Sequence, residues 1–156
     1  MKDPEPGVRR RAALALGRIG PAAKSAVPAL LVAFQKDDEK VLRRIAEAFG
    51  GIGPEAKAAV PFLVAALKDK LPSVRVPVAR ALGAIGQEAE LAVPALIEAL
   101  RDQRAGVAAA EALGQFGPKA EVAVPDLVEF LERSEDEKVR ARVQKALDKL
   151  EGTPSK

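Results

Sequence analysis

The sequence predicts an all-α solenoid made of four helical hairpins and a C-terminal capping helix, with no β-structure. Two short motifs carry this prediction. An Ala-Leu/Phe-Gly-x-Ile/Phe-Gly motif occupies residues 15–20, 48–53, 81–86 and 112–117, and a Val-Pro pair follows each copy at residues 27–28, 60–61, 93–94 and 124–125. Both motifs recur after 33, 33 and 31 residues. Two markers that keep the same intervals indicate one copied unit, and a period of this length is typical of stacked helical repeats.

Apolar residues at helical spacing predict the first helix of each hairpin. In the second copy, Val41, Ile45, Phe49 and Ile52 recur at i, i+4, i+8 and i+11, which places them on one helical face. One position between these apolar residues is always alanine: Ala15, Ala48, Ala81, Ala112 and Ala146. Such a small side chain allows a neighbouring helix to approach closely. The last glycine of each motif fits the left-handed position that ends a helix.

The second helix of each hairpin contains the Val-Pro pair. Val60, Leu63, Val64 and Leu67 form its apolar stripe in the second copy. Proline lacks a backbone N–H, so we expect a kink at this pair in all four copies. We expect Asp37 or Asp38, Ser73, and a capping box of Ser134 and Glu137 to begin the following first helices. The predicted domain is residues 1–151, with hairpins at about 6–36, 38–69, 72–102 and 104–133, a cap helix at 135–151 and a disordered tail at 152–156.

The composition excludes several chemistries. The chain has no cysteine and no histidine, which excludes a thiolate nucleophile, an imidazole proton relay and disulfides. We therefore expect no enzyme activity, no cofactor and no metal site. The longest apolar stretch, residues 58–67, is shorter than a membrane span, and residues 1–8 are charged and contain prolines, unlike a signal peptide. We expect a cytoplasmic protein with no membrane partner.

Further residues point to a known family. Val8-Arg9, Val74-Arg75 and Val139-Arg140 precede the Ala-Leu-Gly motif, and Ala-Val-Pro-x-Leu follows it. In these residues the chain resembles HEAT repeats of the short bacterial, phycobilisome-lyase-like type. The resemblance implies a right-handed superhelix whose concave face, lined by second helices, holds other proteins. It also implies a ladder of Asp–Arg pairs between repeats, which is incomplete here because Leu42 and Gly106 replace the arginine in two copies.

The candidate binding residues are the exposed second-helix positions at which the copies disagree. The position after each proline is Ala29, Phe62, Ala95 and Asp126, and the position three residues later is Val32, Ala65, Glu98 and Glu129. These positions share one helical face, which is apolar in the N-terminal half of the chain and acidic in the C-terminal half. We predict that this face binds a protein or peptide. The alternative is that Phe62 packs sideways against a neighbouring repeat and the small residues are ordinary surface.

Leu14 is a candidate contact at the N-terminal edge. Later copies have charged residues at its position, namely Glu47, Arg80, Glu111 and Lys145. Leu14 could face a further repeat, a second copy of the chain, or only solvent.

The function expected from the sequence is that of a non-catalytic interaction scaffold; the alternative is a structural segment of a larger repeat protein, enzyme or designed assembly. Nucleic-acid binding is less favoured. The net charge of +3 is small, there is no aromatic platform, and the arginines are expected on the first helices, away from the concave face.

Overall fold

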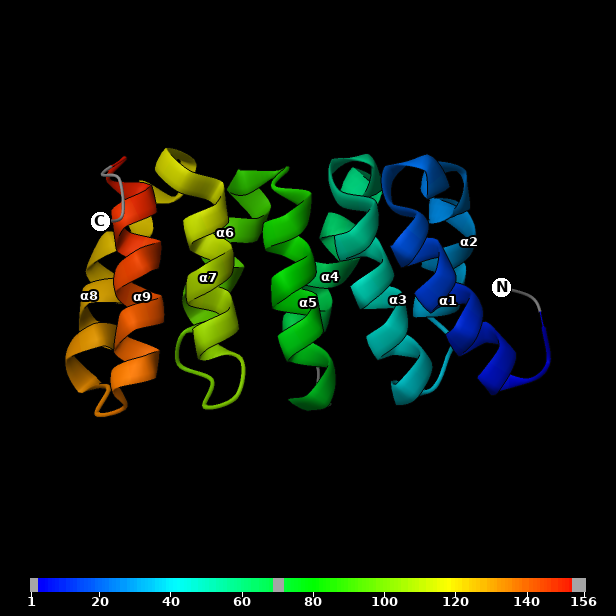
Figure 1. Cartoon of the computed structure of the whole chain (residues 1–156), viewed down its shortest axis with the longest axis horizontal. Helices are drawn as coiled ribbons and strands as arrows, with labels where there is room; N and C mark the ends of the chain where they lie inside the picture. The colour runs from blue at the N-terminus through cyan, green and yellow to red at the C-terminus, as the bar shows by residue number, and fades with distance from the viewer. Residues whose placement is uncertain (1–2, 69–71, 153–156) are drawn as a thin grey trace.

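The computed structural model describes residues 3–68 and 72–152, and its helices stack in two layers (Figure 1). The first helices form one layer: α1 (Pro6–Ile19), α3 (Glu39–Ile52), α5 (Pro72–Ile85), α7 (Gly106–Phe116) and α9 (Glu137–Leu150). The second helices form the other: α2 (Val27–Phe34), α4 (Val60–Leu67), α6 (Ala89–Ala99) and α8 (Val124–Arg133). No strand occurs in the described residues, and the predicted all-α solenoid is confirmed.

The core is aliphatic and continuous from one repeat to the next. Along the first layer, α1 packs on α3, α3 on α5, α5 on α7 and α7 on α9. The predicted stripe of the second copy is buried, because Val41, Ile45, Phe49 and Ile52 are each at most 1% exposed. No polar or charged residue is buried among the described residues. Burial of apolar surface between successive repeats therefore holds the array together.

Successive first helices come into backbone contact at an equivalent position of each repeat, which we call the seam. The third residue of each motif is a glycine that faces the invariant alanine of the next copy. A Cβ atom added to Gly83 would lie 2.8 Å from Cα of Ala112, and one added to Gly114 would lie 2.9 Å from Cα of Ala146. The same arrangement joins Gly17 to Ala48 and Gly50 to Ala81. The seam thus explains why the alanine position never varies. It also requires a glycine at the contacting position of the preceding first helix.

The two ends of the array differ at this seam. Ala15 is exposed, and Ile19 is 57% exposed whereas its equivalent Ile52 is fully buried. At the other end Asp148 stands where the earlier copies have the seam glycine, and it accepts a hydrogen bond from Gln144 (2.9 Å). Leu14, the predicted edge residue, is half-buried, so Ala15 and Ile19 provide more of the exposed apolar surface of α1.

In three copies the second helix begins at the Val-Pro pair, and in the third copy it begins before it. In hairpins one, two and four, a 3₁₀ helix leads into the second helix, at η1 (Gly20–Ala26), η2 (Gly53–Ala59) and η3 (Gly117–Ala123). In the third copy α6 is continuous and Pro94 lies inside it. The kink that was expected at the Val-Pro pair lies earlier where the structure shows one, at Ala56 in η2 and at Ala120 in η3. A proline follows the terminal glycine in the three 3₁₀ copies, whereas Gln87 follows Gly86, and the chain turns through a left-handed Glu88 instead.

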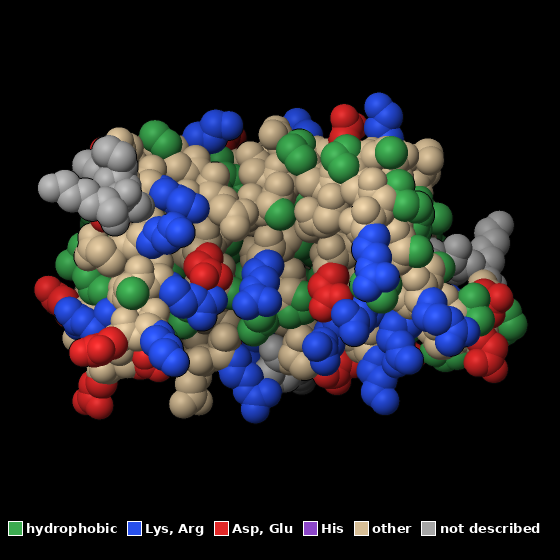
Figure 2. Space-filling model, viewed as in Figure 1, with side chains coloured by type: hydrophobic (Ala, Val, Ile, Leu, Met, Phe, Trp, Pro, Cys, Tyr) green, Lys and Arg blue, Asp and Glu red, His purple; other side chains and the backbone are tan. Residues whose placement is uncertain are grey.

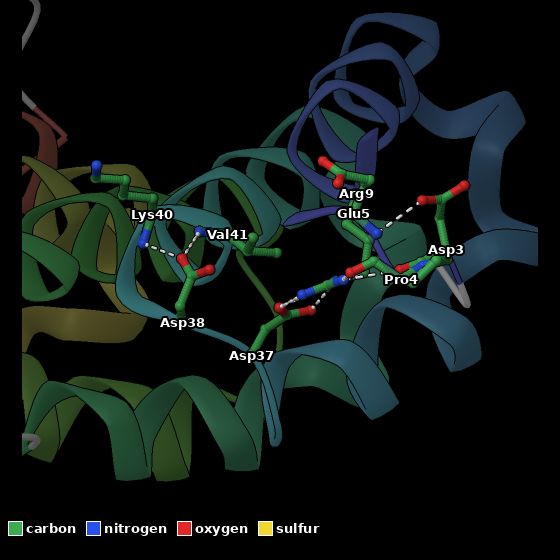
Figure 3. A network of polar contacts seen from close by, with 8 residues as sticks. All are labelled: Asp3, Pro4, Glu5, Arg9, Asp37, Asp38, Lys40 and Val41. Atoms are coloured by element: carbon green, nitrogen blue, oxygen red, sulfur yellow. Dashed lines mark hydrogen bonds and ion pairs between the residues drawn. The ribbon is translucent and has the colours of Figure 1, made fainter. Parts of the chain in front are cut away.

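Aspartates cap the first helices α3 and α9, and other aspartates tie neighbouring hairpins together, as Figure 3 shows for α3. The Asp38 carboxylate accepts hydrogen bonds from the amides of Lys40 and Val41, which caps α3. Asp37 pairs with Arg9, whose Nε donates to Oδ2 at 2.9 Å. A second pair of this kind joins Arg75 to Asp102, with 2.7 Å between nitrogen and oxygen. These pairs link an arginine of one first helix to the turn that precedes the next.

The cap of α9 differs from the expected capping box. Asp136 accepts from the amides of Lys138 (2.7 Å) and Val139 (3.3 Å), while the Ser134 hydroxyl donates to the Phe130 carbonyl instead. Residue 69 of the second predicted hairpin and residues 153–156 of the predicted disordered tail lie outside the described residues. Across the described ranges, every helix is too short or too polar to span a membrane.

Candidate functional site

The predicted second-helix residues divide into an N-terminal group that is apolar and exposed and a C-terminal group that differs in exposure from residue to residue. Ala29 and Val32 on α2 and Phe62 and Ala65 on α4 are all exposed, with Val32 at 58% and Phe62 at 37%. Neither α2 nor α4 contains a charged residue. The N-terminal half of the second-helix face is therefore an uncharged strip.

The C-terminal half of this face is not the continuous surface that the sequence suggested. Ala95 is only 6% exposed, because α6 packs closely against α4. Glu98 is exposed but forms an ion pair with Lys68 (2.9 Å), and both Ala95 and Glu98 line a small hollow of about 260 Å³. On α8, Asp126 is half-buried and Glu129 is exposed. The predicted face is therefore not continuous through the third copy, and the expectation that Ala95 is a surface residue was wrong.

Two larger grooves lie on the opposite side, on the outward face of the first helices. One, of about 520 Å³, lies between α3 and α5, and its floor includes Gly50, Ala81 and Ala84. The other, of about 590 Å³, runs over α5, α7 and α9, and its floor includes Ala112 and Ala146. Arg80 and Ala84 line both grooves, so the two are adjoining parts of one furrowed surface.

The seam explains why the surface is furrowed here. Gly50 and Ala81 form one seam contact, and Ala112 and Ala146 each belong to another. These same residues lie at the bottom of the grooves. Helices that touch through glycine and alanine have no large side chain along the contact line. A hollow is left between the longer side chains on either side of it.

The sides of the grooves are mainly basic, as Figure 2 shows for this face, where Lys and Arg side chains spread across the first helices. The two carboxylates that line the grooves already have cationic partners. Glu47 pairs with Arg44 (2.6 Å) and Glu111 with Arg142 (2.7 Å). Four exposed cations beside the grooves form no hydrogen bond or ion pair within the described part of the chain: Arg43, Arg80, Lys145 and Lys149.

The charge environment of Glu111 reflects this excess of cations. Its hydrogen bond with Arg142 lowers the pKa of the Glu111 carboxyl, and the nearby charges of Arg80 and Lys149 act in the same direction. The carboxylate therefore stays ionised and is compensated by surrounding positive charge. In the residues that the structure describes, no group of three or more His, Cys, Asp or Glu side chains is placed to hold a metal ion.

Sequence reasoning missed the first-helix face although the signal was present. The copies also disagree at two first-helix positions, which hold Glu47, Arg80, Glu111 and Lys145 in one series and Gly51, Ala84, Gln115 and Lys149 in the other. The rule that variable positions are surface positions, applied there as on the second helices, would have selected seven of these eight residues as groove-lining; only Gly51 lines neither groove.

Comparison with known proteins identifies the repeats. A model of HEAT repeats matches residues 1–48 and 27–113, and a model of the PBS lyase HEAT-like repeat matches residues 107–133. The comparison with curated proteins gives no match.

Similar solved structures include three crystal structures from the Northeast Structural Genomics Consortium, each described as an engineered protein. The first is 24% identical with a TM-score of 0.77 and covers 97% of this chain and 78% of its own. The second is 26% identical with a TM-score of 0.73, covering 97% and 76%. The third is 25% identical with a TM-score of 0.71, covering 98% of this chain and 46% of its own. These structures share the fold of this stack of hairpins. The model of HEAT repeats, which covers more than half of the chain, shows that the chain belongs to the HEAT-repeat family.

Proposed function

We propose that this protein is a non-catalytic scaffold that binds a protein or peptide partner on the outward face of its first helices. HEAT repeats are a scaffold often used in protein interaction. Solenoid repeats offer extended surfaces for this purpose rather than reactive centres. The observation that carries the proposal is the pair of adjoining grooves that share Arg80 and Ala84.

The geometry of the grooves suits a partner segment laid across several repeats. The floor consists of small residues fixed by backbone contact, so it does not have to rearrange on binding. A preformed surface loses little conformational entropy when it is occupied, which favours affinity. The side chains at the groove edges differ from copy to copy. These differences would determine which part of the partner contacts which repeat.

The uncharged strip of α2 and α4 is a second candidate. It consists of Ala29, Val32, Phe62 and Ala65, which are exposed on two helices without charges. Exposed apolar patches commonly mark interaction sites. No large groove accompanies this strip in the described residues, so it ranks below the first-helix face.

A selection experiment separates the two faces. Peptides selected on the immobilised protein from a random displayed library are tested again on Ala84→Gln and on Phe62→Asp. Ala84→Gln fills the point shared by both grooves with a neutral side chain that copy four already carries at its equivalent position, Gln115. Loss of binding on Ala84→Gln and retention on Phe62→Asp supports the first-helix face. The opposite pattern assigns binding to the second helices, and failure to select any specific peptide contradicts the scaffold function.

A further inference from the structure

We infer that the partner on the first-helix face is an acidic protein segment, whose carboxylates contact the unpaired cations beside the two grooves. The inference rests on the proposed function and adds the chemistry of the partner.

The first step is the charge left over after internal pairing. The carboxylates at the grooves, Glu47 and Glu111, are each within 2.7 Å of an arginine nitrogen. The remaining charged side chains that line the grooves, including Arg80, Lys145 and Lys149, are exposed cations without a partner in the described residues. An acidic ligand would supply the missing counter-charges. Complementary charge of this kind increases the association rate and selects the partner.

The second step is the separation of charge between the two layers. The exposed charges of α2, α4 and α6 are few, and α8 carries three acidic side chains, Asp126, Glu129 and Glu132, against the single cation Arg133. The net charge of +3 therefore understates how basic the first-helix face is. An acidic segment is attracted to one face and repelled by the α8 region of the other.

The alternation of charge along the first helices favours a protein segment over a nucleic acid. At equivalent positions of successive copies the side chains are Glu47, Arg80, Glu111 and Lys145, so a carboxylate interrupts the cations at every second repeat. A phosphate backbone carries charge at regular short intervals and would meet both glutamates. The groove floor also has no aromatic ring on which a base could stack. A peptide can place neutral side chains opposite the glutamates and small apolar side chains over the alanines.

The test uses fluorescence anisotropy with four labelled probes and the full chain. Three amphipathic peptides share one apolar face of Leu and Ala and carry Glu, Gln or Lys on the polar face; the fourth probe is a duplex DNA. The variant Arg80→Glu/Lys145→Glu reverses two groove cations. Its matched control, Lys36→Glu/Lys119→Glu, makes the same change in net charge with two exposed lysines away from the grooves.

The inference predicts that the Glu peptide binds most tightly and that its affinity falls as salt rises. Reversal of Arg80 and Lys145 should weaken it by at least about tenfold, since two attractions become repulsions, while the control stays within about threefold.

Equal binding of the Glu and Gln peptides, lost on Ala84→Gln, overturns the acidic partner but leaves the proposed function intact. Tighter binding of DNA than of the Glu peptide, or equal losses in the groove variant and its control, also overturns it. If none of the four probes binds, the inference is wrong, whereas the proposed function is judged separately by the peptide selection.

Discussion

The seam between first helices makes a specific prediction for Gly83→Ala. The added Cβ would lie 2.8 Å from Cα and 2.9 Å from Cβ of Ala112, and 2.9 Å from Oε1 of Gln115. Carbon atoms in contact normally stay about 3.5–4.0 Å apart. The Gln115 side chain can rotate away, but the Ala112 Cα belongs to the backbone of α7. The substitution can be accommodated only if α5 and α7 move apart.

The magnitude follows from two opposing terms. Alanine in place of glycine inside a helix stabilises it by about 1 kcal/mol. Overpacking of a tight contact costs roughly 1–3 kcal/mol. Gly7→Ala adds a helical Cβ without this clash, because no atom other than those of its chain neighbours and its own helix backbone lies within 4 Å of a Cβ at that position. Gly83→Ala should therefore be less stable than Gly7→Ala by about 1–3 kcal/mol, and less stable than or equal to the wild type.

The assay is urea denaturation of the wild type and both variants, followed by far-UV circular dichroism. In thermal melts the same difference corresponds to about 2–4 °C for each kcal/mol in a chain of this size. If Gly83→Ala is as stable as Gly7→Ala, then α5 and α7 are not in backbone contact and the seam is misplaced.

Three further predictions concern the caps, the acid response and the N-terminal end. Asp136→Ala removes the acceptor for two amides of α9 and should cost about 1 kcal/mol in a thermal melt, whereas removal of the Glu137 carboxylate by Glu137→Gln should cost less than half as much. Burial opposes ionisation of Asp102, but amide hydrogen bonds from Ala105 and Arg104 and the charge of Arg75 outweigh it and keep the pKa below its usual value. A carboxyl group with a lowered pKa in the folded state stabilises the fold above its pKa in the unfolded chain, about 4, and this stability is lost as the pH falls through the folded-state pKa. The urea midpoint of Asp102→Asn should therefore fall less between pH 7 and pH 3 than that of the wild type. An equal fall contradicts the role of Asp102. Ile19→Asp should change stability by less than about 0.5 kcal/mol because Ile19 is exposed, while Ile52→Asp should unfold its repeats; similar losses in both would show that the end of α1 is covered.

The sequence was sufficient for the fold because each repeat carries its own local signals. The apolar stripe of Val41, Ile45, Phe49 and Ile52 and the terminal glycines specify helices and their ends without long-range information. The invariant alanine even indicated a close helix contact. Its partner glycine was not identified, since pairing Gly83 with Ala112 requires the register between two helices.

Two local departures from the predicted fold can be traced to residues in the sequence. Gln87 stands where the other copies have a proline after the terminal glycine, and in this copy the residues before Val93 belong to α6 and not to a 3₁₀ helix. Ser134 and Glu137 have the spacing of a capping box, which predicted a helix start at Ser134. The actual N-cap, Asp136, lies two residues later.

The binding face was the least predictable feature. Helical phase shows which residues point outward from each helix, but it does not show which layer has grooves. That depends on the spacing between helices, which the Gly–Ala seams set in three dimensions. Ala95 shows the same limit, because its burial comes from the packing of α6 on α4 and not from its position after a proline.

Methyl NMR of alanine tests the central claim, that binding occurs on the first-helix face. Ala84, Ala112 and Ala146 lie on the groove floors, whereas Ala29 and Ala65 lie exposed on the second helices. Titration of the alanine-labelled protein with the Glu peptide should shift the first three methyl signals and leave the other two unchanged. Shifts confined to Ala29 and Ala65 would contradict the claim.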